Sequence, residues 1–166
     1  LVFVRQAAMP INQFTQQSNF MLAAMAGAER IFRMMKEQPE EDEGHVILTP
    51  AEQTPQGTIK KSIRKTGCWA WEDPLDHSLT LLRGDVRFHD VVFGYTPEKT
   101  ILHSISLYAK PGQKIAFVGS TGAGKTTIIN LINRFYDIHS GSITYDGIDV
   151  RKIRKDSLRR SLAVVL

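Results

Sequence analysis

One stretch of this chain reads Gly119-Ser120-Thr121-Gly122-Ala123-Gly124-Lys125-Thr126-Thr127, and few local sequences tie residue type so closely to one ligand. Its spacing, G-x-x-x-x-G-K-[ST], lets glycines turn consecutive backbone N–H groups inward around an anion. In such a loop the lysine reaches the β- and γ-phosphates of a nucleoside triphosphate, and the next hydroxyl completes the oxygen shell of a phosphate-bound Mg²⁺ ion. The stretch therefore predicts a triphosphate site, with Lys125 on the phosphates and Thr126 on the metal.

The flanking residues supply the structural setting that such a loop needs. Residues 114–118, Lys-Ile-Ala-Phe-Val, form a short apolar run typical of a buried parallel strand. Apolar residues at helical spacing follow over 128–135, and the start of that helix, with its unpaired N–H groups and its dipole, favours the α-phosphate. We therefore expect all nine residues from Gly119 to Thr127 to take part in nucleotide binding, in the order strand, loop, helix.

Length and composition narrow the class of protein. The chain has 166 residues and a net charge of +4, enough for about one domain. Its basic residues are scattered, so we expect no nucleic-acid partner. The single Cys68 excludes an internal disulfide, makes a zinc site improbable and fits a reduced, cytosolic setting. The chain begins at Leu1 rather than Met and ends inside an apolar run, so we expect it to be a segment of a longer protein.

Residues 1–38 carry the periodicity of a long helix. Apolar and small residues recur at steps of three and four, which places them on one face: Ile11, Phe14, Ser18, Met21, Met25, Ala28, Phe32 and Met35. We expect this face to pack against a partner. Pro10 predicts a helix start or a kink, and Gln38-Pro39 predicts the end. No apolar run approaches the roughly 20 residues of a membrane span, so hydropathy alone does not predict one.

Residues 39–84 are interpreted as a linker or insertion. Proline and glycine recur through the segment and its start is acidic, which favours a disordered loop over an extra contact with a partner subunit. Trp69-Ala70-Trp71 is the exception, because two tryptophans at period two are typical of a short strand. Packing in a core fits these tryptophans better than stacking on a ligand does.

Residues 85–166 show apolar runs separated by turn-forming residues, a pattern typical of strands joined by turns. Strands are predicted at 85–88, 91–95, 101–108 and 142–145, and the last of these leads into a hairpin at Asp146-Gly147. A brief helix at 157–160 and another buried strand at 162–166 follow. The fold class is therefore α/β: an antiparallel part and the start of a parallel core sheet, preceded by a long N-terminal helix.

Several ordered motifs in this region resemble the nucleotide-binding domain of ATP-binding cassette (ABC) transporters. They are Val91-Val92-Phe93-Gly94-Tyr95, Leu102-His103-Ser104-Ile105-Ser106-Leu107, 111–119 with Pro-Gly-Gln-Lys-Ile-Ala-Phe-Val-Gly, Ser140-Gly141-Ser142-Ile143 with Asp146-Gly147, and Leu158-Arg159. More narrowly, the chain looks like an exporter-type half-transporter for drugs or lipids. The resemblance covers residues 84–166 and extends to residues 1–44, which look like the last membrane helix and its cytoplasmic extension.

The resemblance implies an ATP site with Mg²⁺. It implies that Tyr95 stacks on the adenine ring, a contact that contributes about 1–3 kcal/mol in comparable base–aromatic pairs. The intact protein would be an ATP hydrolase. In the family, however, the Mg²⁺-contacting glutamine, the signature loop, the acidic strand with the catalytic glutamate and the switch histidine all follow the point where this chain ends. We therefore expect no catalytic residue here beyond the phosphate-stabilising Lys125, and an inactive segment when it stands alone.

The same resemblance implies a division into three parts: residues 1–38 as the end of the transmembrane domain, 39–84 as the linker, and 85–166 as the N-terminal part of the nucleotide-binding domain. It implies a multi-pass protein of the cell membrane with the ATPase on the cytoplasmic side. The partners would be a second half-transporter, identical or related, and a transported small molecule, lipid or peptide.

Three other functions remain open from the residues. A soluble ABC-type ATPase of DNA repair or translation would share these motifs but lack a helix from the membrane feeding the domain. A kinase or GTPase with a phosphate loop would have no need of Tyr95 in its strand context. A regulatory module would bind ATP and lack the catalytic acid.

Overall fold

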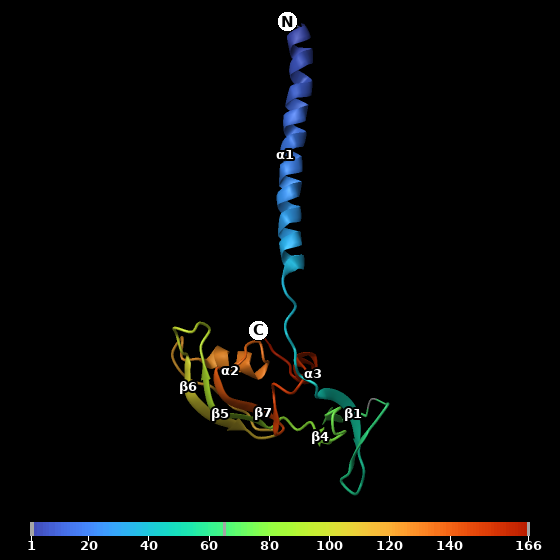
Figure 1. Cartoon of the computed structure of the whole chain (residues 1–166), viewed down its shortest axis with the longest axis vertical. Helices are drawn as coiled ribbons and strands as arrows, with labels where there is room; N and C mark the ends of the chain where they lie inside the picture. Colours follow the sequence, from blue (N-terminus) through green and yellow to red (C-terminus); the bar gives the residue numbers. More distant parts are fainter. Residues whose placement is uncertain (1, 65, 166) are drawn as a thin grey trace. The chain divides into compact units, whose positions relative to one another are not determined.

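The structure, a computed structural model, describes residues 2–64 and 66–165, without the side chains of residues 2–9, 11 and 12. Its backbone divides into two units, residues 1–41 and residues 42–166. The first unit contains the helix α1 (Val2–Lys36), and the second contains the strands β1 to β8 and the helices α2 and α3 (Figure 1).

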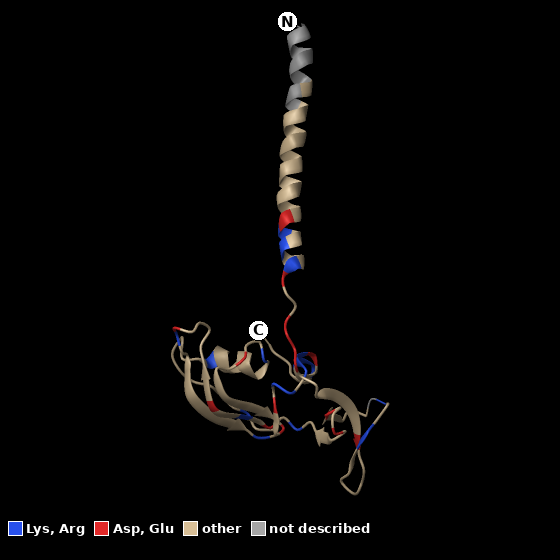
Figure 2. Cartoon of the chain, viewed as in Figure 1, with Lys and Arg blue, Asp and Glu red and all other residues tan. Residues whose placement is uncertain are grey.

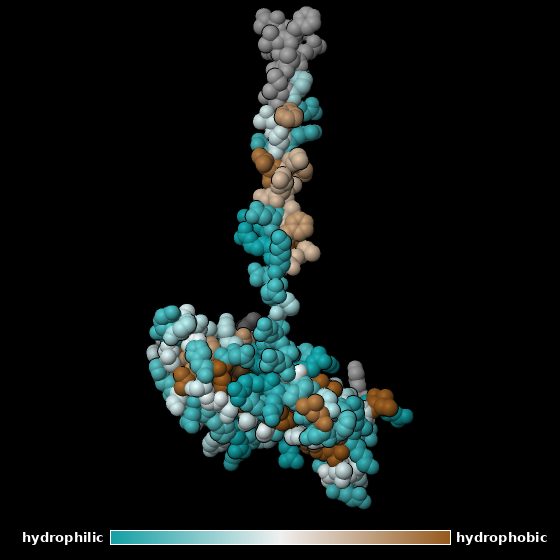
Figure 3. Space-filling view, in the orientation of Figure 1, coloured by the Kyte–Doolittle hydropathy of each residue, from teal (hydrophilic) through white to brown (hydrophobic). Residues whose placement is uncertain are grey.

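Helix α1 confirms the predicted long helix but not a start at Pro10. The proline lies inside the helix, although an interior proline removes one hydrogen bond of the ladder and crowds the preceding turn. Among the predicted stripe, Phe14, Met21 and Phe32 are exposed, and the side chain of Ile11 lies outside the described residues. In the described part of the helix, charged side chains gather at the C-terminal end, while apolar ones occupy the middle (Figures 2 and 3).

Within the residues that the structure describes, no helix is both long enough and apolar enough to cross a membrane.

The second unit is built on a four-stranded antiparallel sheet. Its order is β6 (Leu102–Ala109), β5 (Val86–Phe93), β7 (Ser140–Tyr145) and β8 (Ile148–Asp149). Alternate residues of β5 are buried, as the period of a half-buried strand requires. The two strands predicted at 85–88 and 91–95 are one strand, whose register shifts on either side of Asp90, a residue at φ 48°.

Local turn and helix predictions are confirmed in this unit. Asp146 and Gly147 both have positive φ, 53° and 83°, as the two-residue turn of a tight hairpin demands. They join β7 to β8 in the antiparallel register predicted. The helix after the phosphate loop is α2 (Lys125–Ile132), and the short helix near the end is α3 (Lys155–Ser161).

Two predicted strands do not form. Residues 114–118 and 162–165 belong to no strand, and Val118 is 94% exposed. A parallel strand needs a hydrogen-bonded neighbour, and neither sheet of the described residues includes these segments. The apolar pattern therefore identified residues suited to a buried strand, whereas the strand itself depends on partners that the pattern does not show.

The expectation of a disordered loop at residues 40–84 is wrong. This segment forms a second antiparallel sheet in the order β2 (Ile59–Lys61), β1 (Ile47–Gln53), β3 (Trp69–Glu72) and β4 (Leu79–Leu81). Gly57 and Gly67 lie between strands at φ 84° and 78°, so they mark turns rather than disorder. The predicted tryptophan strand is β3.

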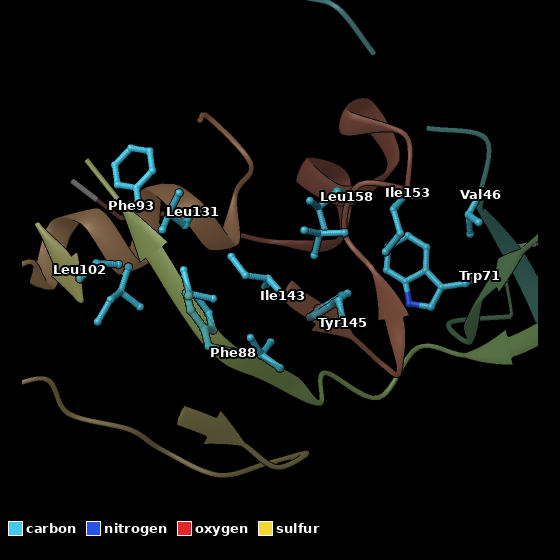
Figure 4. Packing of buried hydrophobic residues seen from close by; sticks show 14 residues of the cluster. Val46, Trp71, Phe88, Phe93, Leu102, Leu131, Ile143, Tyr145, Ile153 and Leu158 are labelled. Carbon is cyan, nitrogen blue, oxygen red and sulfur yellow. The ribbon is translucent and has the colours of Figure 1, made fainter. Parts of the chain in front are cut away.

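One hydrophobic core serves both sheets of the second unit (Figure 4). Trp71 of β3 is 1% exposed, and its ring meets that of Tyr145 edge to face with centroids 5.5 Å apart. Val46 and Ile153 lie on the same side of the core and pair as an isolated parallel bridge. The prediction that Trp71 packs in a core is confirmed, and the second sheet is part of the folded unit.

Candidate functional site

The phosphate loop turns into α2 through two glycines in a left-handed backbone conformation. Gly122 and Gly124 have φ of 88° and 84°, which L-residues with a Cβ rarely adopt. A Cβ on Gly124 would also lie 2.8 Å from Leu102 Cδ2. Gly124 caps α2 without any side-chain hydrogen bond, so the first N–H groups of the helix remain as donors for a ligand.

Lys125 lies folded over this loop. Its Nζ donates to the carbonyl of Gly119 at 2.8 Å and to that of Ser120 at 2.7 Å. An ammonium group has three donors, so these two contacts leave one free and hold the positive charge next to the loop amides. The predicted loop residues Gly119 and Ser120 thus meet Lys125 through their carbonyls.

Tyr95 lies two residues beyond the end of β5 and faces the same loop. Its hydroxyl is 3.3 Å from Thr127 Oγ1 and accepts a hydrogen bond from Asn130 Nδ2 at 3.1 Å. Its ring meets the rings of Phe93 and Tyr136 edge to face, with centroids 5.1 and 5.0 Å apart. The residue is 45% exposed, so a flat ligand can reach it.

A cavity of about 470 Å³ joins Tyr95 to the loop. It is lined by Tyr95, Ile101, Thr121, Gly122, Gly124, Lys125, Thr126 and Thr127. The structure therefore brings most of the predicted site residues to one place. Three predicted residues lie in the loop but outside this lining: Gly119, Ser120 and Ala123. The lining also includes Ile101, which was not predicted.

Asn130 and Tyr136 are also neighbours of Tyr95 that the sequence interpretation missed. Asn130 follows Thr127 by three positions in α2, so helical periodicity places both on one face and could have pointed to it. Nothing in the local sequence indicated Tyr136, because its contact with Tyr95 depends on how the chain returns after α2.

The chemistry of the cavity suits a polyanion. Its volume lies within the range of ordinary ligand sites, and none of the described residues in its lining is acidic. Thr126 is exposed in it, so its hydroxyl fits as one oxygen ligand of a Mg²⁺ ion whose other ligands would be phosphate oxygens and water. Elsewhere in the described residues, no group of three or more His, Cys, Asp or Glu side chains could hold a metal ion.

A larger hollow of about 800 Å³ lies against the outer side of β5 and the edge of the second sheet. Arg87 and Asp85 in its lining form a close ion pair, 2.6 Å between Nε and Oδ1. Hydrogen bonding to that guanidinium lowers the pKa of Asp85, and the carboxylate raises the pKa of Arg87. The two charges offset each other, and the phosphate loop contributes nothing to this hollow, so the smaller cavity is the better candidate site.

Comparison with known proteins agrees with the geometry. Residues 102–166, which include the whole phosphate loop, match the family described as ABC transporter. These residues belong to the ABC transporter family. The matched residues contain β6, the phosphate loop, α2, β7, β8 and α3.

Relatives match nearly the whole chain. The uncharacterized ABC transporter ATP-binding protein YfiC of Bacillus subtilis is 35% identical over 165 residues, which are 99% of this chain and 22% of that protein. The fatty acid ABC transporter ATP-binding/permease protein of Mycobacterium bovis is 34% identical over 164 residues, 99% of this chain and 21% of that protein. The chain thus spans about a fifth of the length of these ABC transporter proteins.

A solved structure is also similar. It is titled the structure of a bacterial Atm1-family ABC exporter with ATP bound, and it is 45% identical, with 46% of this chain and 14% of that chain covered and a TM-score of 0.46.

Proposed function

We propose that this chain is the ATP-binding part of an ABC exporter half-transporter, in which ATP binding and hydrolysis are coupled to transport across a membrane. The observation that carries the proposal is the cavity in which Tyr95 faces Lys125 and the phosphate loop. An aromatic face and a phosphate cradle in one cavity match the two ends of ATP. The family membership of residues 102–166 supports the same conclusion.

Each part of the site has a role in this proposal. The adenine ring stacks on Tyr95, and the phosphates bind the loop amides from Gly119 to Thr127. Lys125 exchanges its contacts with the carbonyls of Gly119 and Ser120 for contacts with the β- and γ-phosphates. Thr126 is the protein ligand of Mg²⁺, which when bound neutralises part of the phosphate charge.

Hydrolysis needs more than this cradle. Phosphoryl transfer is catalysed by positioning and by stabilisation of developing charge, and it requires a group that orients the attacking water. The residues of this chain supply the cradle, and we assign the water-orienting and acidic groups to other parts of the intact protein and its partner. The segment by itself is expected not to turn over ATP.

The rest of the chain fits a transporter. Residues 1–38 are proposed as the end of a transmembrane domain and its cytoplasmic extension, 39–84 as the connection, and 85–166 as the beginning of the nucleotide-binding domain. The exposed apolar side chains of α1 give this helix a face for a partner. One relative that matches 99% of the chain is named an ATP-binding/permease protein, which supports a permease part on the same polypeptide.

In the proposed cycle, two half-transporters in the cell membrane close their cytoplasmic ATP-binding domains on two ATP molecules. Closure follows from the higher affinity of ATP for the closed state. It moves the membrane helices between two orientations and carries a small molecule, lipid or peptide across. The partner is a second copy or a related half-transporter.

The test is calorimetric titration of the intact protein with Mg²⁺–ATP. Lys125→Ala should weaken binding at least tenfold, because a charge-assisted phosphate contact disappears. Lys114→Ala is the matched control, since Lys114 is an exposed lysine outside the cavity lining, and it should bind ATP as the parent protein does. Undiminished binding by Lys125→Ala would contradict the proposed site, and preference for GTP over ATP would favour a GTPase instead.

A further inference from the structure

We infer that Asn130 is a positioning residue that fixes the ring of Tyr95 and thereby sets how strongly the site prefers adenine nucleotides over bare polyphosphate. This inference rests on the proposed function, because it assigns the base of ATP to Tyr95.

The hydroxyl of Tyr95 contacts two side chains of α2. Oη accepts from Asn130 Nδ2 at 3.1 Å and lies 3.3 Å from Thr127 Oγ1. A tyrosine hydroxyl has one donor and two acceptor positions, so it can serve both partners at once. Asn130 and Thr127 lie one turn apart on α2, the helix that begins at Lys125. The position of the ring is therefore tied directly to the helix that holds the phosphate-binding lysine.

Other constraints on the ring are incomplete. Tyr95 lies past the last residue of β5, so no strand fixes its backbone, and its side chain is only half buried. Phe93 and Tyr136 contact the ring edge to face and limit its tilt. The hydroxyl anchor adds the constraint at the far end. A ring held at both ends loses less conformational freedom when a base stacks on it, which improves affinity.

The place of Asn130 separates its role from that of the phosphate loop. Asn130 contacts Tyr95 but is not among the residues that line the cavity. It can influence a ligand through the tyrosine ring and not through the phosphates. Loss of its amide should therefore weaken only the part of the affinity that comes from the adenine.

Tripolyphosphate provides the discriminating probe, because it has the phosphates of ATP without the base. The measured quantity is the ratio of the two affinities in the intact protein, with Mg²⁺, by calorimetric titration. Tyr95→Ala should reduce the preference for ATP by about 5- to 150-fold, the range of a lost base–aromatic stack. Asn130→Leu, which keeps the size of the side chain and removes the donor, should reduce it by about two- to tenfold.

Asn133→Ala is the matched control. Asn133 is an asparagine at the end of the same helix, and its amide donates to the carbonyl of Ile129 at 3.0 Å rather than to Tyr95. Its loss can loosen α2, but it should leave the ratio of ATP to tripolyphosphate affinity unchanged. The control therefore separates general destabilisation of the helix from positioning of the ring.

A double-mutant cycle with Tyr95→Phe completes the test. Because that variant lacks the hydroxyl, Asn130→Leu should have no further effect on the ratio in its background. Equal loss of ATP and tripolyphosphate affinity in Asn130→Leu would overturn the inference, as would an effect that persists in the Tyr95→Phe background. Failure of the parent protein to bind ATP would instead contradict the proposed function itself.

Discussion

The indole N–H of Trp71 donates to the Oδ2 atom of Asp146 at 3.0 Å, across 75 residues of sequence. The same carboxylate accepts from the backbone N–H groups of Arg83 at 3.1 Å and Asp85 at 2.9 Å. Asp146 occupies the tight turn between β7 and β8. This one turn residue therefore joins the β7–β8 hairpin to β3 of the second sheet and to residues 83–85, which follow that sheet. This junction explains why residues 40–84 are part of the folded unit.

Trp71→Phe should loosen this junction while retaining most of the buried ring. A hydrogen bond to a charged group contributes about 1.5–3 kcal/mol, and Asp146 keeps two other donors, so we expect a loss near the lower end. Amide hydrogen exchange of the intact protein should show lower protection in β3 and in the β7–β8 hairpin. Trp69→Phe is the control, since the side chain of Trp69 is only partly buried. Equal effects of the two substitutions would contradict the role of Trp71.

Features that depend only on residues adjacent to one another in the sequence were predictable from it. The phosphate loop and the Asp146-Gly147 turn each follow from backbone conformations that only certain residues adopt. The strand predicted at 114–118 does not form, because a strand also needs a hydrogen-bonded neighbouring strand, and an apolar pattern does not show whether one is present. The second sheet was missed because proline and glycine break elements in a sequence, whether they lie in a loop or at the turns of a sheet.

The site divides in the same way. Spacing located Gly119 to Thr127, and the resemblance to a family added Tyr95. The hydrogen bond from Asn130 to Tyr95 joins residues 35 positions apart, and the end of β5 and α2 share one hydrophobic core through Phe93 and Ile128. Such contacts can be identified only when the fold is known.

Asp42 should hold the first residues of the second unit, 42–46, against the start of α3. Its Oδ2 accepts from the N–H of Lys155 at 2.8 Å, and its Oδ1 lies 3.5 Å from Nη1 of the buried Arg134. Asp42→Asn removes the charge and keeps the shape. We expect a local loss of about 1–2 kcal/mol, because Asp42 is partly exposed and the pair is partly screened.

Hydrogen exchange of residues 42–46 and 152–155 in the intact protein measures this loss. Glu41→Gln changes the neighbouring exposed carboxylate and should leave the exchange rates of both segments unchanged. If Asp42→Asn also left them unchanged, the contact with Arg134 would have no part in holding the segment.

Acid should weaken the end of the β7–β8 hairpin. Partial burial acts to raise the pKa of Asp149, but its hydrogen bonds to Arg151 outweigh burial and hold the pKa below the usual 3.8. A carboxyl whose pKa is lowered by folding stabilises the fold above its unfolded pKa, and this contribution disappears as the pH falls through the folded pKa. The contribution should therefore be complete near pH 6 and lost well below pH 4.

Arg151→Gln is the variant that tests this dependence. It should reduce the exchange protection of the hairpin at pH 6 and have progressively less effect as the pH falls below the usual pKa of 3.8, because Asp149 is then protonated and the pair is weakened. Lys114→Gln, a change in an exposed cation that is not among the charges acting on Asp149, serves as the control. A difference between parent protein and Arg151→Gln that stayed constant over this range would exclude the ion pair as its cause.

Gly124→Ala should abolish the phosphate site for a steric reason that a second glycine can isolate. Gly124 and Gly57 have the same φ, 84°, so alanine introduces a similar backbone strain of about 1–2 kcal/mol at each. Only at Gly124 would the added Cβ also meet a side chain, Leu102, at 2.8 Å, whereas the position at Gly57 is open. The overlap forces a shift either of the Leu102 side chain or of the phosphate loop, and we expect the loop to move because Leu102 is buried in the core. We therefore expect at least a tenfold loss of Mg²⁺–ATP affinity for Gly124→Ala and parent-like affinity for Gly57→Ala, measured by calorimetric titration of the intact protein; comparable affinities for the two variants would show that close contact with Leu102 does not shape the loop.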